Sequence, residues 1–170
     1  GKLMLNVLLS FAQFEREITG ERIRDKIAAS KQKGMWMGGV PPFGYDGVDR
    51  RLEINEAEAE IVRHIFQRFT MLESVTEVVK ELRRDGVRTK TYTTTTGKNK
   101  VGKIMDKGFV YKMMGNQVYL GEIVHKDKVY PGQHKAIIDR EVWDKARQIN
   151  ASNPHVRANS QRREMPAMLR

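Results

Sequence analysis

A short segment rich in glycine and lysine is the most direct candidate for chemistry in this sequence. Residues Gly97–Lys103 read GKNKVGK and match the first seven positions of a phosphate-binding P-loop. The next position of that motif must be Ser or Thr to hold magnesium, but Ile104 stands there, and the polar run TYTTTT replaces the apolar strand that should precede it. A P-loop enzyme would reveal itself by binding ATP. The better interpretation is a flexible basic loop that contacts nucleic-acid phosphates.

No other set of side chains forms a recognisable catalytic or metal-binding pattern. Cysteine is absent, which excludes thiolate catalysis, disulfides and cysteine zinc sites within this sequence. The four histidines lack the spacing of metal ligands, and the five serines form no nucleophile–base arrangement. We therefore expect no catalytic residue, no metal ion and no cofactor in this chain.

The charge of the chain is strongly positive and unevenly distributed. The net charge is +10 with a pI near 9.9, and residues 80–112 hold ten basic and three acidic side chains. Such a clustered stripe is the usual footprint of a polyanion partner, although a solvated charged surface is the simpler alternative. We predict a nucleic-acid partner. No apolar run approaches the roughly 18 residues that cross a bilayer, and no signal peptide is visible, so we expect a cytoplasmic location.

A short helix over Asp106–Met114 is the predicted recognition element. Its apolar residues suffice to fasten one face to a core, and Gly115 follows it as a stop signal. Side chains near the start of such a helix can reach base edges while lysines meet phosphates, although an ordinary surface helix would have the same pattern. The lysines of this predicted DNA-binding surface are Lys98, Lys100, Lys103, Lys107 and Lys112.

A long helix is predicted over Leu3–Lys33, with Gly34 as its end. Its first half is apolar on more than one face and should bury itself in a domain or against a partner helix. Its second half is charged and should project into water or along phosphates. Residues 34–45 are the elbow, in which Gly and Pro residues as far as Pro42 forbid regular structure. In the elbow, Trp36 is equally suited to a DNA minor groove and to packing on the neighbouring domain.

The rest of the chain predicts a small, mostly helical α+β domain over Gly34–Asn150. The polar segment Thr89–Gly102 is typical of a loop or a poorly paired strand, and Ala151–Arg170 of a linker or tail. The predicted elements are helices at Asn55–Thr70, from Ser74 to the stop at Gly86, Asp106–Met114 and Asp139–Ile149, and hairpins within Phe43–Ile54 and Val118–Tyr130.

Two blocks of sequence closely resemble the large serine recombinases of the resolvase/invertase superfamily. The first block is FAQFEREITGERIRDKI followed by a G-x-x-x-GG-x-PPFGY elbow. The second, VYKMMGNQVYLGEI and then HKAIIDREVWDKAR, resembles the recombinase domain of that family. The resemblance spans about Leu3–Ile149, and two separate blocks in the right order make it specific.

The resemblance implies three parts. Residues 1–33 would be the long helix that leaves a catalytic domain, pairs with its copy and brings Arg16, Arg22 and Lys26 to DNA. The two arginines would lie near the cleaved phosphates or the dimer contact. Residues 34–150 would be the DNA-binding recombinase domain, with its short recognition helix in the major groove and the elbow along the minor groove. Residues 151–170 would lead towards a zinc-ribbon domain.

The resemblance also implies an enzyme whose nucleophilic serine lies upstream of the long helix, outside this sequence. The full-length protein, a phage or bacterial integrase or transposon recombinase, would cut both strands at a two-base crossover through phosphoserine links and religate them after subunit rotation. It would act as a dimer on each double-stranded attachment site and as a tetramer in synapsis, whereas these residues alone would bind without cutting. A non-catalytic DNA-binding regulator with a dimerising N-terminal helix is the alternative.

Overall fold

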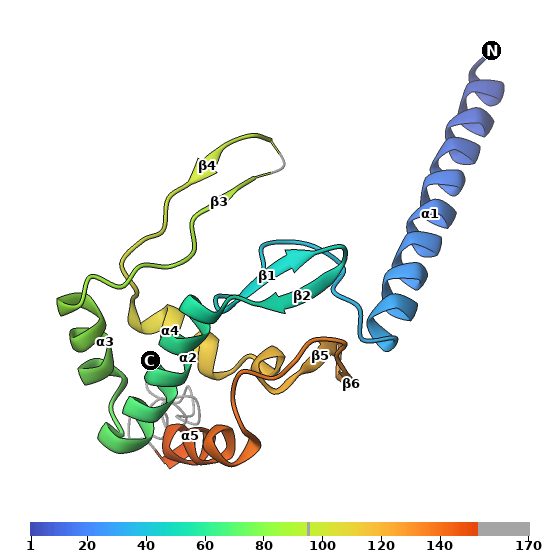
Figure 1. Cartoon of the computed structure of the whole chain (residues 1–170). Coiled ribbons are helices and arrows are strands. Elements are labelled where there is room, and N and C mark those ends of the chain that lie inside the picture. The colour runs from blue at the N-terminus through green and yellow to red at the C-terminus, as the bar shows by residue number, and fades with distance from the viewer. Residues whose placement is uncertain (95, 153–170) are drawn as a thin grey trace, which may run out of the picture.

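A long helix that stands away from a small helical domain defines the molecule, a computed structural model that describes residues 1–94 and 96–152 (Figure 1). The domain combines short helices with antiparallel two-stranded hairpins, which confirms the predicted α+β class. In chain order the elements are α1 (Lys2–Gln32), β1 (Tyr45–Val48), β2 (Arg51–Ile54), α2 (Glu56–Leu72), α3 (Val75–Arg84), β3 (Tyr92–Thr93), β4 (Asn99–Lys100), α4 (Lys107–Met114), the 3-10 helix η1 (Gln117–Leu120), β5 (Glu122–His125), β6 (Lys128–Pro131) and α5 (Arg140–Ser152).

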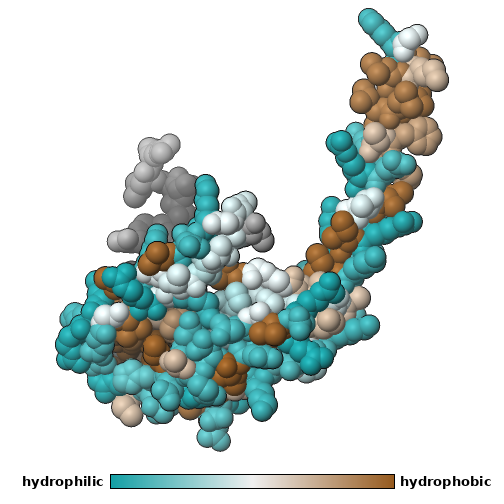
Figure 2. All heavy atoms as spheres, turned by 45° about the horizontal axis from the view of Figure 1, so that its top comes forward, coloured by the Kyte–Doolittle hydropathy of each residue, from teal (hydrophilic) through white to brown (hydrophobic). Residues whose placement is uncertain are grey.

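Helix α1 ends at the elbow, as predicted, through a glycine-centred cap. The backbone N–H of Gly34 donates to Lys31 O at 2.9 Å, and that of Met35 donates to Ser30 O at 3.1 Å. Gly34 has a φ of +73°, which completes the left-handed cap that ends many helices. The apolar first half of α1 is not buried by the rest of the chain: Leu3 is 83% exposed and Phe11 64% exposed. Figure 2 shows these hydrophobic side chains over the far end of the helix.

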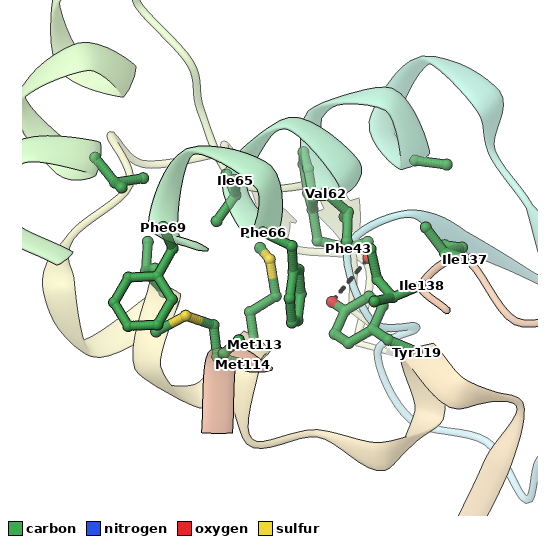
Figure 3. Close-up of a cluster of buried hydrophobic side chains, with 14 of the residues drawn as sticks. Phe43, Val62, Ile65, Phe66, Phe69, Met113, Met114, Tyr119, Ile137 and Ile138 are labelled. Carbon is green, nitrogen blue, oxygen red and sulfur yellow. Dashed lines mark hydrogen bonds between the residues drawn. The ribbon is translucent and has the colours of Figure 1, made fainter. Parts of the chain in front are cut away.

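Helix α2 forms the centre of the hydrophobic core (Figure 3). Asn55 caps it as predicted, because its side-chain oxygen accepts from the Glu58 N–H at 3.3 Å. The ring of Phe66, fully buried on α2, stacks on Trp143 of α5 at a centroid distance of 5.8 Å. The other fully buried α2 side chains are Ala59, Val62, Ile65 and Phe69. Burial of these side chains against α3 and α5, in one hydrophobic cluster with Met113 and Met114 of α4, is the main force that assembles the domain.

Three local predictions need correction. Val118–Leu120 was expected to be extended but lies in η1, because the Asn116 side chain accepts from the Val118 N–H at 3.2 Å and starts a tight helical turn. Ser74 precedes α3 as expected, yet its side chain makes no capping hydrogen bond. Helix α5 continues to Ser152, past its predicted end at Ile149, and the rest of the predicted linker or tail, residues 153–170, lies outside the described residues.

The polar segment after α3 forms an arm, residues 88–104, that leaves the domain as a narrow hairpin (Figure 1). Its outer part pairs β3 with β4, and its base is held by an antiparallel bridge between Arg88 and Ile104. The expectation of a loop or a poorly paired strand is therefore close to what is seen. In the view of Figure 1, the arm and α1 extend from the core in the same general direction.

The elbow joins the core through backbone and tyrosine hydrogen bonds. The hydroxyl of Tyr119 donates to Phe43 O at 2.9 Å, the bond dashed in Figure 3, and that of Tyr45 donates to Lys135 O at 2.8 Å. Burial raises the pKa of both phenols, so they remain donors throughout the neutral range. Gly44, which lies between Phe43 and Tyr45 in the sequence, has a φ of +95° and leaves no space for a larger residue.

A second joint connects the end of α1 to the β5–β6 hairpin, about a hundred residues later in the chain. The backbone N–H of Gln133 donates to Gly34 O at 2.9 Å, and its side-chain amide donates to Lys33 O at 2.8 Å. A Cβ on Gly34 would lie only 2.3 Å from Pro131 O. The base of α1 is therefore fitted closely against the hairpin.

The packing around Gly44 leads to a stability prediction. A Cβ there would lie 2.9 Å from Ile137 Cδ1 and 3.1 Å from Val62 Cγ2, in addition to the strain of positive φ. We expect Gly44→Ala to lower the free energy of unfolding by about 2–5 kcal/mol, measured by urea denaturation. Gly86→Ala is the matched control, because Gly86 also has a positive φ, +69°, but open space around it, and should cost about 1–2 kcal/mol. Equal losses in the two variants would contradict the packing argument.

Candidate nucleic-acid interface

Two open clefts with basic side chains flank the elbow. The first, the helix cleft, lies between the end of α1, the elbow and the β1–β2 hairpin and has a volume of about 850 Å³. Lys26, Lys33 and Arg50 line it together with Trp36. These residues come from three separate segments, so the fold gathers positive charge that the sequence leaves dispersed.

Arg50 is a member of this cleft that the sequence analysis missed. Asp49 and Arg50 form the two-residue turn between β1 and β2, with φ values of +45° and +62°. Such turns favour Asn-Gly, so a non-glycine pair here carries backbone strain of the kind that often accompanies functional positions. The Trp36 N–H donates to Arg50 O at 3.0 Å, which ties the strained turn to the elbow. The sequence signal that could have identified this turn is that only two residues separate Val48, the last residue of β1, from Arg51, the first residue of β2.

The second cleft, the arm cleft, lies between the elbow, the base of the arm and α4, with a volume of about 470 Å³. Lys103 from the arm and Lys112 from α4 line it, and Pro41 belongs to both clefts. Asp106, the acidic residue beside these lysines, caps α4 by accepting from the Phe109 N–H at 2.7 Å. The helix was predicted to begin at Asp106, and the structure shows this residue as its cap at the cleft wall.

The predicted site residues fall into three groups. Lys26 and Trp36 meet in the helix cleft, and Trp36 is also partly buried against the core. Lys103 and Lys112 meet in the arm cleft. The others are exposed but line neither cleft: Arg16 and Arg22 on α1, Lys98 and Lys100 on the arm, and Lys107 at the first turn of α4.

The arm does not have the geometry of a phosphate-binding P-loop. Gly97, with a φ of +77°, lies in the turn between β3 and β4, and Asn99 and Lys100 form β4 itself. A P-loop needs a strand, then a loop, then a helix directly after its lysine, whereas here extended chain continues from Lys103 to Met105 before α4. The Lys100 ammonium of β4 lies 6.0 Å from the centre of the Tyr92 ring of β3, a weak cation–π contact across the hairpin.

A cluster of charged residues anchors the base of the arm to the core. Lys90 is nearly buried, with its ammonium 2.5 Å from Asp46 Oδ1 and 3.0 Å from Glu58 Oε2. The same Glu58 oxygen accepts from the Gly44 N–H at 2.8 Å, and Asn55 donates to Asp46 at 2.8 Å. Glu58, three residues after the helix cap Asn55, therefore bonds to the elbow and the arm, while the Asn55 N–H donates to Gly44 O at 3.0 Å. Sequence reasoning also missed Lys90 as a structural residue.

This cluster shifts the pKa values of two of its members. The hydrogen bond from Lys90 is the main reason that the pKa of Asp46 falls below its usual range. Burial alone would lower the pKa of Lys90, but its hydrogen bonds to the two carboxylates outweigh burial and raise it. The contacts therefore favour an ammonium between two carboxylates, and the cluster keeps the arm in register with the β1–β2 hairpin.

Two other kinds of site are absent from the described part of the chain. Within residues 1–94 and 96–152, no group of three or more His, Asp or Glu side chains is placed to hold a metal ion. Over the same residues, no helix has both the length and the apolar character needed to cross a membrane.

Two family models match most of the described chain. Residues 56–153 match the family model described as Recombinase, and residues 1–36 match the model for the resolvase N-terminal domain. No curated protein matched the chain.

Two solved structures are similar to this chain over most of its length. A structure described as "Sequence Requirements of the Listeria innocua prophage attP site" has a TM-score of 0.64 at 25% identity, covering 78% of this chain and 52% of its own. Another, "Crystal Structure of a LSR-DNA Complex", has a TM-score of 0.63 at 26% identity, covering 76% and 38%. This chain thus spans about half or less of the proteins that it matches.

The charged cluster leads to a prediction about pH. Lys90→Met keeps the length of the side chain but removes its charge, so the pKa of Asp46 should rise towards the ordinary carboxyl range in an NMR titration. A depressed folded-state pKa stabilises the protein above the ordinary carboxyl pKa, and this stabilisation is lost as the pH falls through the folded value. The variant should therefore lose less stability between neutral and acid pH than the parent.

Lys80→Met is the control for this titration. Lys80 pairs with Glu77 on the exposed face of α3, so its removal should leave Asp46 unchanged. A pKa of Asp46 that stays equally low in Lys90→Met would contradict the assigned cause.

Proposed function

This chain belongs to the large serine recombinases, and from that premise we propose that its two clefts and its arm bind the duplex DNA of a recombination site. The observation that carries the proposal is the gathering of lysine and arginine on both sides of the elbow. Lys26, Lys33 and Arg50 line one side, and Lys103 and Lys112 line the other. A duplex laid across the elbow would meet both groups.

The proposal divides the work between phosphates and bases. Lysines in the two clefts would neutralise phosphates and so fix the position of the domain on the duplex. The first turn of α4, which begins at Lys107 and faces the arm cleft through Gly108, would approach base edges in the major groove. The elbow between the clefts would follow the minor groove, and Arg16, Arg22 and Lys26 would continue the phosphate contacts along α1.

We assign strand cleavage to a catalytic serine in a resolvase domain of the parent protein. The support is the match of residues 1–36 to a resolvase N-terminal model, which covers α1 and the part of the helix cleft that holds Lys26, Lys33 and Trp36. In that scheme the full-length protein cuts and rejoins DNA, and the residues described here hold the attachment site. The chain alone would bind DNA without cutting it.

The exposed apolar row of α1 supports a second part of the proposal, which is pairing with another copy of α1. Val7, Phe11 and Phe14 follow one another at helical spacing, and each is about half exposed or more. Apolar side chains in a row this long are costly to leave in water, so a second helix with the same row is a suitable cover. The pair would place two DNA-binding domains on the two halves of one site.

The first functional prediction concerns the salt dependence of DNA binding. We expect the affinity of the chain for duplex DNA, measured by fluorescence anisotropy, to fall steeply between 50 and 200 mM salt (on the order of tenfold or more) because bound phosphates release counterions. Lys107→Ala and Lys112→Ala should each weaken binding at low salt and reduce the slope of log affinity against log salt by about 0.9.

Lys145→Ala is the matched control for these two variants. Lys145 is exposed on α5, which lies across the core from the arm in Figure 1, so its removal should change neither affinity nor slope. A flat salt dependence in the parent would contradict the proposal, and unchanged affinity in both lysine variants would contradict the assigned face.

The second functional prediction concerns self-association. The double variant Phe11→Glu/Phe14→Glu should raise the dimer dissociation constant by at least about a hundredfold in sedimentation experiments. The reason is that each copy loses two aromatic side chains that the proposed pair would bury. The control, Asn6→Glu/Gln13→Glu, adds the same charge to the same helix away from that row and should change it little. A parent that stays monomeric at high concentration would remove the proposal of pairing.

A further inference from the structure

A single isoleucine stands exposed among the lysines of the arm cleft. Ile104 is 52% exposed and lines that cleft between Lys103 and the start of α4. Exposed aliphatic side chains are ordinary when scattered singly over a surface. This one lies instead on the wall of a basic concavity, next to the predicted recognition helix, so its chemistry calls for a ligand group that is apolar.

The exposure of Ile104 follows from the local backbone. Ile104 forms an isolated antiparallel bridge with Arg88, and the N–H of Met105, the next residue, donates to Val87 O at 3.4 Å. Met105 is fully buried in the core, whereas the side chain of Ile104 stays exposed. The backbone on both sides of Ile104 is therefore fixed while its apolar side chain faces solvent.

The segment that carries Ile104 is also held rigidly. The Thr89 N–H donates to Lys103 O at 2.8 Å, and the Lys103 N–H donates to Thr89 Oγ1 at 3.0 Å. Arg88 adds a bond from its guanidinium to Gly102 O at 3.2 Å. Gly102 packs so closely that a Cβ there would lie 1.8 Å from Thr89 O. A side chain on such a support loses little freedom on binding, which favours specific contacts.

The composition of the arm cleft limits how bases can be recognised there. Among its described lining residues there is no Arg, Asn or Gln, the side chains that usually make paired hydrogen bonds to G or A in the major groove. Its acidic residue, Asp106, is engaged in capping α4. The lysines suit phosphates, and Ile104 and the half-exposed Val40 on the elbow are the exposed large aliphatic side chains that this cleft offers to a base edge.

The C5 methyl of thymine is the apolar group that the major groove offers to such a side chain. We propose that Ile104 contacts the C5 methyl of a thymine and is a determinant of sequence specificity. This inference rests on the proposed function, since it names which base the DNA-binding face selects. The charge of the cleft favours DNA over an apolar protein segment as the occupant, because lysines line it beside a carboxylate that is already bonded.

The test removes the C5 methyl group of one thymine from the DNA and, separately, the Ile104 side chain from the protein. Duplexes that bind the chain are first selected from a random pool, and each thymine of the best site is then replaced singly by deoxyuridine. One replacement should weaken binding by about fourfold, as expected for the loss of one buried methyl group. Ile104→Ala should weaken binding to the thymine duplex by a similar factor or more, and it should bind the thymine and uracil duplexes equally at that position.

Val129→Ala is the matched control, because Val129 is also about half exposed, at 48%, but lies on β6 outside the arm cleft. It should retain both the affinity and the sensitivity to uracil. Thermal melting checks that Ile104→Ala is folded, which its exposed position favours. If that variant is unfolded, Ile104→Ser, which also removes the methyl groups of the side chain, takes its place under the same criterion.

Several outcomes would overturn the inference. If no single uracil weakens binding, or if the sensitivity persists in the Ile104 variant, the methyl contact is wrong while the DNA-binding proposal stands. If no duplex in the pool binds at all, the proposed function fails and the inference fails with it. Binding of the selected duplex by the unsubstituted chain distinguishes these two failures.

Discussion

One carboxylate oxygen, Oε2 of Glu58, holds together the parts of this domain that face its clefts. It accepts from the Gly44 N–H at the end of the elbow and from the Lys90 ammonium at the base of the arm, while Glu58 itself belongs to the central helix α2. Helix α2 is anchored in the close-packed core by fully buried aromatic side chains. The two bonds to Glu58 therefore hold the elbow and the base of the arm in fixed positions relative to the core. The two clefts depend on that fixed geometry.

The elements that sequence reasoning located correctly are those with strong local signals. Helix α1 ends at Gly34 and α4 begins after Asp106, because glycine and aspartate satisfy helix ends through bonds to near neighbours. The 3-10 helix over Gln117–Leu120 was missed because its apolar residues are equally compatible with a strand. The local bond from the Val118 N–H to Asn116 and the long-range hydrogen bonds that join Tyr119 to Phe43 and Ile137 decide between the two.

The candidate site was less accessible from the sequence than the fold. Lysine enrichment pointed to the arm and to α4, and the structure brings Lys103 and Lys112 into one cleft. Arg50 and Lys90 escaped notice because their roles depend on partners distant in sequence: Trp36 for the first, and Asp46 and Glu58 for the second. Linear charge counts treat all lysines alike, whereas the fold uses Lys90 inside a cluster and leaves Lys107 in water.

The joint between α1 and Gln133 has a mechanical consequence. Helix α1 has 31 residues and is therefore about 46 Å long, so a tilt of about 10° at its base would displace its far end by roughly 8 Å. The two hydrogen bonds from Gln133 to Lys33 and Gly34 lie at the base of the helix, where such a tilt would occur. Small changes in the β5–β6 hairpin would be amplified along the helix, and the stiffness of a few atoms at the joint sets how accurately its tip is aimed.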